Sequence, residues 1–164
     1  MILKEHYKKI IESTHQSLKN AGFVKNGNTF RISSDESWGV INFQKSTKST
    51  VDSITFTINL GVASKRLLKI YNPKQIENPD IWDCHWQVRI GHLLPDNKDI
   101  WWTILAETNV DQLAQDIQKY TIKLGIPEIQ KYLSDGALRD LWLTDKSPSL
   151  TKVQRLKYLA ELMK

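Results

Sequence analysis

An unbroken alternation of apolar and polar residues over Ile54–Val62 constrains the fold of this chain more than any other feature. The segment reads Ile-Thr-Phe-Thr-Ile-Asn-Leu-Gly-Val, so Thr57 and Asn59 belong to its polar set. Successive side chains of a β-strand point to opposite faces, and the pattern therefore predicts a half-buried strand of an antiparallel sheet. The polar face of this strand is the first candidate for a functional surface.

Further strands are predicted on both sides of this segment. The dipeptide Asn26-Gly27 is the strongest short signal for a β-hairpin, and we expect a type I′ turn there, followed by a second arm over Thr29–Ser33. Trp38–Ser46 and Trp82–Leu93 also read as strands, whereas Ile100–Ile104 is either a short strand or the approach to a helix.

Helical patterns flank this run of strands. An apolar stripe predicts a helix over Leu3–Asn20, and a second helix begins near Thr108 and ends at Gly125 and Pro127. Three more helical segments follow, at Glu128–Leu133, Ala137–Leu143 and Leu150–Leu162. The order predicts one α+β domain over residues 1–164, with an N-terminal helix, an antiparallel sheet of about five strands, and C-terminal helices on one sheet face. The opposite face of such a sheet can remain exposed to water.

The composition excludes several classes of protein. No apolar run approaches the roughly 18 residues of a membrane helix, so we expect no membrane partner, and the N-terminus lacks the apolar core of a secretory signal. The single cysteine, Cys84, excludes an internal disulfide framework and a cysteine-rich zinc site, which favours the cytoplasm. No glycine-rich phosphate loop is present, and we predict no cofactor.

The positive charge is concentrated in the first half of the chain. The net charge is +5, with a balance of +7 over residues 1–75 and −2 over residues 76–164. A basic half is compatible with a nucleic-acid partner. We favour a solvated lysine-rich surface instead, because the lysines are scattered and do not form a block.

Several landmarks together resemble a bacterial family defined as domain of unknown function 4304 (DUF4304). The resemblance runs from about residue 5 to about residue 125, and it depends on the order and spacing of short pieces. Those pieces are Ala21–Phe23, Lys25, Gly27–Phe30, Val40–Ser46, Phe56–Val62, Arg89–Gly91, Leu94-Pro95 and Trp101-Trp102. The resemblance implies no activity and supplies no catalytic residues, and it leaves the last helix outside the matched part.

His85 and Arg89 are the most specific pair of candidate site residues. They lie on one face of the strand predicted at Trp82–Leu93, roughly 13 Å apart along the backbone. A histidine and an arginine on one polar face can bind phosphate or carboxylate, or act as a base and an anion clamp. The competing interpretation is structural: Arg89 forms an ion pair, with Asp83 as the candidate partner, and His85 bonds to a neighbouring strand.

Amides and hydroxyls extend this candidate surface. Asn42 and Gln44 share one face of their strand, Thr57 and Asn59 share one face of theirs, and Gln87 lies between His85 and Arg89. Such side chains suit a hydrogen-bonding floor for a ligand, or they pair with one another across the strands.

We predict no metal site and no catalytic residue. Asp83, Cys84 and His85 are consecutive, and adjacent strand residues point to opposite sides, so the three cannot reach one ion. The leading hypothesis is therefore a non-catalytic binding module that uses the polar sheet face or a groove for a protein partner or a small anionic ligand. The alternatives are a hydrolase-like enzyme using His85 and Arg89, and a nucleic-acid-binding domain.

The tryptophans and the cysteine are assigned mainly to the core. Trp82 and Trp86 fall on the apolar face of their predicted strand, with Cys84 buried between them as a small hydrophobic residue. Trp101 and Trp102 are adjacent, so we expect one to pack in the core and the other to lie on the surface.

Overall fold

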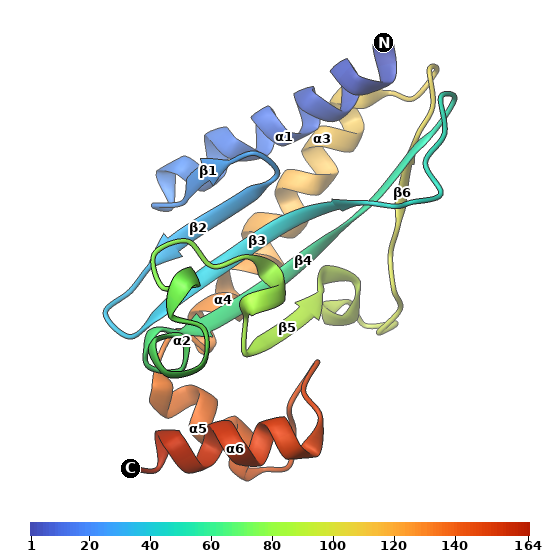
Figure 1. Ribbon diagram of the computed structural model, residues 1–164. Coiled ribbons are helices and arrows are strands. Elements are labelled where there is room, and N and C mark those ends of the chain that lie inside the picture. Colours follow the sequence, from blue (N-terminus) through green and yellow to red (C-terminus); the bar gives the residue numbers. More distant parts are fainter.

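The computed structural model describes all residues from Met1 to Lys164 and shows an α+β fold around a six-stranded antiparallel sheet (Figure 1). The strand order is β1-β2-β3-β4-β5, and the short β6 pairs with β4 beyond the end of β5. The α+β prediction is confirmed, with one strand more than expected. The strands are β1 (Val24–Asn26), β2 (Thr29–Ser33), β3 (Ser37–Lys45), β4 (Ile54–Ser64), β5 (Trp86–Arg89) and β6 (Trp102–Ile104).

The two longest strands pair in the register that the alternation predicts. Asn42 lies opposite Asn59, and Gln44 lies opposite Thr57, so the four polar side chains share one face of the sheet. The apolar set of β4 points to the other face, where Ile58 is fully buried in the main hydrophobic core. One strand face is therefore apolar and core-forming, and the other is lined with hydrogen-bonding groups.

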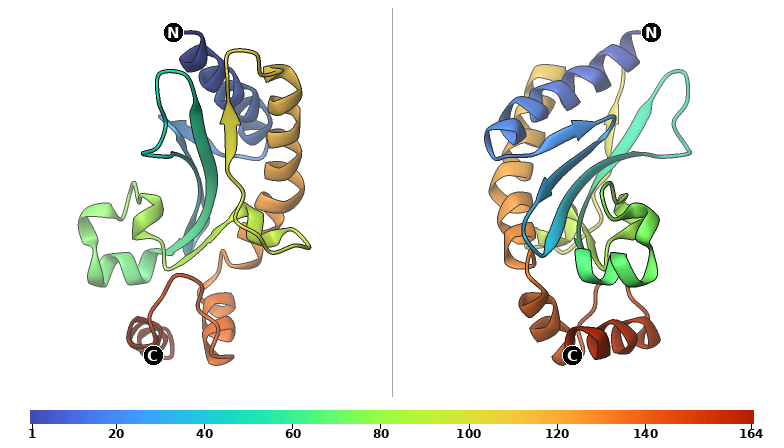
Figure 2. Two further views of the ribbon diagram at one scale, coloured as in Figure 1. Left: turned by 90° about the vertical axis from the view of Figure 1, so that its right-hand side faces the viewer. Right: turned by 60° about the vertical axis from the view of Figure 1, so that its left-hand side comes forward.

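Helices lie on both sides of the sheet and beyond one end of it. Figure 2 shows α1 (Ile2–Asn20) and α3 (Val110–Tyr120) against the core face, with α2 (Lys65–Tyr71) on the opposite side. The last two helices, α5 (Asp135–Leu143) and α6 (Lys152–Leu162), extend past the end of the sheet. None of the helices combines the length and apolar character required to cross a membrane.

The first hairpin turns one residue later than predicted. Asn26 pairs with Thr29, so Gly27 and Asn28 are the two central residues of the turn. Only Gly27 has a positive φ, 63°, which is the pattern of a type II′ turn with glycine first and not of the predicted type I′ turn. Glycine accepts this conformation without the steric cost that a Cβ would add.

The helix that was predicted to end at Gly125 continues. α3 passes through a π-helical turn over Thr121–Gly125 into α4 (Ile126–Lys131). Gly125 is buried against the sheet, where an added Cβ would lie 3.3 Å from Leu60 Cδ2, so it serves close packing and not helix termination. Pro127 comes two residues after the π-helical turn; it has no N–H to donate to the preceding turn, and the π-helical turn is where the regular i to i−4 bonding is interrupted.

The predicted strand over Trp82–Leu93 is much shorter than expected. Only Trp86–Arg89 is extended, and it lies between a 3₁₀ turn at Ile81–Asp83 and another at Ile90–Leu93. The alternation assigned to this segment therefore fails at Trp82, which is 63% exposed, whereas Trp86 is buried as predicted.

A small second core closes part of the polar sheet face. Cys84 and Ile81 pack over Gly61 of β4, where an added Cβ would lie 2.6 Å from Cys84 Sγ. Cys84 is buried, as predicted, but in this second core and not beside Trp86. We call Ile81 and Cys84 the lid. Beyond the lid, the polar face of the sheet carries Asn59 and Arg89, which are paired between β4 and β5.

Candidate ligand-binding groove

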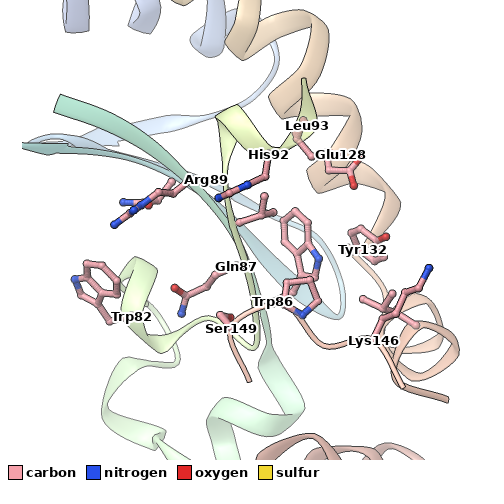
Figure 3. Close-up of a pocket in the computed structure, with 14 residues that line it drawn as sticks. Trp82, Trp86, Gln87, Arg89, His92, Leu93, Glu128, Tyr132, Lys146 and Ser149 are labelled. Carbon is pink, nitrogen blue, oxygen red and sulfur yellow. The ribbon is translucent and has the colours of Figure 1, made fainter. Parts of the chain in front are cut away.

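A groove with a volume of about 630 Å³ follows the outer side of β5 (Figure 3). We call it the β5 groove. It is bounded by β5, the 3₁₀ turns on either side of β5, the end of α4, helix α5, and the connection between α5 and α6. Its lining residues are Asn59, Trp82, Trp86, Gln87, Val88, Arg89, His92, Leu93, Glu128, Tyr132, Leu141, Lys146, Pro148 and Ser149.

The wall that faces the helices is apolar. Figure 3 shows Trp86 and Tyr132 on the same side of β5, and their ring centroids are 4.8 Å apart. Leu93 and Leu141 complete this wall, and both pack against the main core. An aromatic and aliphatic wall of this kind can bury the apolar part of a ligand.

The opposite wall carries Gln87, Arg89 and the exposed indole of Trp82, and Arg89 is its charged group (Figure 3). Its guanidinium donates from Nη1 to Asp99 Oδ2 at 2.6 Å, and the indole Nε1 of Trp101 donates to the same oxygen at 3.0 Å. The guanidinium also lies over the Trp101 ring, 5.0 Å from its centroid. A guanidinium has five N–H donors, so this arrangement fixes the orientation of Arg89 and leaves most of its donors free.

The amides predicted to form a binding floor mostly bond to one another. Asn59 Nδ2 donates to Asn42 Oδ1 at 3.2 Å and to Gln44 Oε1 at 2.9 Å, and Asn42 in turn donates to Thr29. Thr57 is fully buried and donates to the carbonyl of Ile100 at 2.7 Å. Of these four predicted residues, only Asn59 reaches the β5 groove, and Asn42 and Gln44 fix its orientation.

His85 does not join Arg89 in a common site. It bonds to the neighbouring strand β4, as in the structural interpretation, and Arg89 pairs with Asp99 and not with Asp83. The His85 side chain is buried, its Nδ1 accepts a hydrogen bond from the backbone N–H of Ser64 at 3.0 Å, and its ring meets Tyr158 of α6 edge to face at 5.0 Å. Burial lowers the pKa of His85 to about 4, so the ring is neutral at physiological pH.

A break in the register between β4 and β5 accounts for the position of the His85 side chain. The N–H of His85 donates to the carbonyl of Val62, although Val62 is paired with Trp86. Two consecutive residues therefore lie opposite one, which is the arrangement of a β-bulge. The regular alternation of faces stops at the bulge, and His85 packs beneath α6 instead of lining the groove.

The rim carries further charged groups from the helices and loops. Lys146, in the α5–α6 connection, forms no ion pair, whereas Glu128 of α4 is paired with Lys131 at 3.1 Å. His92 Nδ1 is hydrogen-bonded to Asn97 Oδ1 at 3.0 Å. Arg89 and Lys146 are thus the cations of the groove. Arg89 is paired with Asp99 and Glu128 with Lys131, so Lys146 is the one charged lining residue of the three without an ionic partner.

The structure forms neither a metal-ligating cluster nor an exposed cysteine. No group of three or more histidine, cysteine, aspartate or glutamate side chains is arranged to hold a metal ion. Burial raises the pKa of the Cys84 thiol well above its usual value, so the thiolate required of a nucleophile is disfavoured. The groove around β5 presents an oriented guanidinium, an ammonium group and an apolar wall.

Comparison with known protein families matches residues 14–135 to the domain of unknown function DUF4304. The chain belongs to the DUF4304 family. The comparisons with curated proteins and with solved structures give no match. The matched part of this DUF4304 protein contains β5 and Tyr132, whereas Leu141 and Lys146 lie beyond it, so one side of the β5 groove is built by the segment that follows the family domain.

Sequence reasoning found Asn59, Gln87 and Arg89 but missed the other side of the groove. Tyr132 and Lys146 belong to helices and loops whose packing no local pattern specifies. Trp82 had a usable signal, because Asp80 and Asp83 form a capping box around the turn that carries it. A capping box indicates a helical turn and not a strand.

Proposed function

We propose that this DUF4304 protein is a non-catalytic binding module and that the β5 groove is its ligand site. The ligand class that suits the groove combines an anionic group with an apolar part. The observation that carries this proposal is the placement of Arg89 and Lys146 at the margins of a cavity of about 630 Å³ whose inner wall is formed by Trp86, Tyr132 and Leu141.

The charge distribution supports an anion as the polar part of the ligand. Arg89 donates to Asp99 from one nitrogen only, and Lys146 has no ionic partner. A carboxylate or phosphate can accept two parallel hydrogen bonds from a guanidinium, which gives both affinity and orientation. The pair between Glu128 and Lys131 keeps the acidic group of the rim from repelling such a ligand.

We also propose the cytoplasm as the location of the protein. The single cysteine is buried in the second core and forms no disulfide. A chain that folds without disulfides suits a reducing compartment.

The test of this function compares an acid with its neutral amide. Phenylacetate and phenylacetamide are titrated separately into isotope-labelled protein, and the backbone amides of β5 and the indole N–H of Trp82 are followed by NMR. We expect phenylacetate to shift these resonances and to bind about tenfold more tightly than the amide, because a hydrogen bond to a charged group is worth about 1.5–3 kcal/mol.

The matched variants are Arg89→Ala, which removes the groove guanidinium, and Lys19→Ala, which removes an exposed cation on α1. Arg89→Ala should abolish the preference for the acid, and Lys19→Ala should preserve it. Equal shifts by both compounds, or shifts only outside the groove, would contradict the proposal.

A further inference from the structure

The outer edge of β5 is unpaired. β5 forms a ladder only with β4, since β6 pairs with a separate part of β4. None of the hydrogen bonds made by loops or side chains reaches the backbone of Trp86–Val88. In an antiparallel sheet, alternate residues of an edge strand direct their N–H and C=O groups away from the partner strand, where they can pair with an added chain.

The groove lies along this edge and includes side chains from both faces of β5. Figure 3 shows Trp86 on one side of the strand, and Gln87 and Arg89 on the other. A ligand that follows β5 would meet an apolar wall on one side, and on the other the polar groups of Gln87 and Arg89 together with the indole of Trp82. An extended peptide presents its side chains to two opposite faces in alternation, so its geometry matches this lining.

The cationic side chains of the groove favour a peptide with acidic residues. Arg89 lies on the polar side of β5, and Lys146 lies on the rim without an ionic partner. An acidic residue placed opposite Gln87 and Arg89 would receive charge-assisted hydrogen bonds. An apolar residue next to it in the peptide would face Trp86 and Tyr132.

We propose that the β5 groove binds an extended acidic peptide segment of a protein partner as an added strand on β5. This inference rests on the proposed function, and it goes further by naming the partner chemistry and the backbone that recognises it. Strand addition to a sheet edge combines backbone hydrogen bonds, which provide affinity, with side-chain pockets, which provide specificity. The four residues of β5 would pair with about four residues of the peptide, a length of roughly 13 Å.

The experiment uses the intact protein and four blocked hexapeptides. The parent peptide alternates aspartate or glutamate with valine. One control replaces the acids with asparagine or glutamine, and two others carry N-methyl groups on the odd-numbered or on the even-numbered residues. Because only one backbone edge of the peptide can pair with β5, we expect one N-methylated peptide to bind like the parent and the other to lose about tenfold or more in affinity. The neutral peptide should also lose about tenfold.

Two results would overturn strand addition and leave the proposed function standing. In the first, both N-methylated peptides bind like the parent, which means side-chain capture without backbone pairing. In the second, no peptide binds while phenylacetate still shifts the β5 resonances, so that the groove takes a small anion only. If neither phenylacetate nor any peptide affects the groove, both proposals fail.

A second copy of the chain is the competing occupant of the edge. Sedimentation of the free protein tests it, and we expect a monomer. A dimer whose interface protects the β5 amides would overturn the peptide proposal.

Discussion

The two ends of β5 carry polar side chains in opposite circumstances. His85, just before the strand, is 4% exposed and neutral beneath α6, and its Nδ1 accepts from the Ser64 N–H. Arg89, at the other end, keeps 36% of its side chain exposed and has donors to spare. The sequence places both residues on the same strand face, so what separates them is the tertiary packing at each end. A polar residue on a strand is available to a ligand only where nothing packs over it.

The same lesson applies to the amides across the sheet. Asn42, Gln44 and Asn59 were expected to offer hydrogen bonds to a ligand, but they use their donors and acceptors on one another. Arg89 differs because its partner, Asp99, occupies only one of its nitrogens. The row of hydrogen-bonded amides therefore stabilises the sheet, and the guanidinium of Arg89 is the group with donors left for a ligand.

The largest expected effect is the pH dependence of the unfolding free energy that His85 causes. Burial lowers its pKa from 6.5 to about 4, so between these values the unfolded state binds more protons than the folded state. The contribution of neutral His85 to the free energy of unfolding should therefore be complete above pH 6.5. The free energy of unfolding should fall by about 3 kcal/mol as the pH drops to 4.

Urea unfolding at a series of pH values measures this loss. The control is His85→Asn, which keeps an acceptor for the Ser64 N–H but does not titrate. Its unfolding free energy should fall less over the same interval, because only carboxylates then contribute. Identical pH profiles for the two proteins would show that His85 is not held neutral.

The second test removes the cover over His85. Tyr158 contacts the rings of His85, Tyr71 and Trp142, with centroid distances of 5.0, 5.5 and 6.2 Å. Tyr158→Ala should lower the unfolding free energy by about 2 kcal/mol, somewhat below the cost of truncating a fully buried aromatic residue. It should also raise the pKa of His85 toward 6.5, as followed by NMR of the imidazole.

Tyr158→Phe keeps the ring contacts and serves as the matched control. It should leave the pKa of His85 low. A low pKa in Tyr158→Ala as well would mean that α6 is not what keeps His85 from solvent.

The third test concerns the packing of the lid on Gly61 of β4, the residue that pairs with Gln87 of β5. An alanine Cβ at Gly61 would lie 2.6 Å from Cys84 Sγ and 2.7 Å from Ile81 Cδ1. Gly61→Ala should lower the unfolding free energy by about 1–2 kcal/mol through overpacking. In a Cys84→Ala background, which removes the sulfur, the same substitution should cost less. Strict additivity of the two substitutions would argue against the close packing of the lid on β4.

The smallest effect on stability is expected at the open end of β5. The pair between Arg89 and Asp99 is about one-third exposed, so Arg89→Ala should change the unfolding free energy by less than about 1 kcal/mol. Urea unfolding measures this change, and the phenylacetate titration on the same variant measures the loss of binding. A large destabilisation would assign Arg89 to the fold and remove it from the ligand site.

Much of the fold follows from local patterns in the sequence. The alternation of Ile54–Val62 predicts the central strand and its polar face, and the register between Asn42 and Asn59 agrees with it. The pair Trp101 and Trp102 also divides as expected, since Trp102 packs on Phe56 in the core while Trp101 stacks on Arg89 outside it.

The errors occur where tertiary packing overrides a local signal. The bulge at His85 and the capped turn around Trp82 break an alternation that looks regular in the sequence. Gly125 resembles a helix end but serves the close approach of the π-helical turn to Leu60. The helix-side wall of the β5 groove depends on where α5 and the α5–α6 connection pack. No local sequence pattern around Leu141 or Lys146–Ser149 shows that these residues lie next to β5.

A structure of this DUF4304 protein bound to the parent acidic hexapeptide would show directly whether β5 accepts an added strand. We expect an extended peptide beside β5, with backbone hydrogen bonds to that strand and a carboxylate on Arg89. A peptide bound elsewhere on the molecule, with the outer edge of β5 still unpaired, would contradict it.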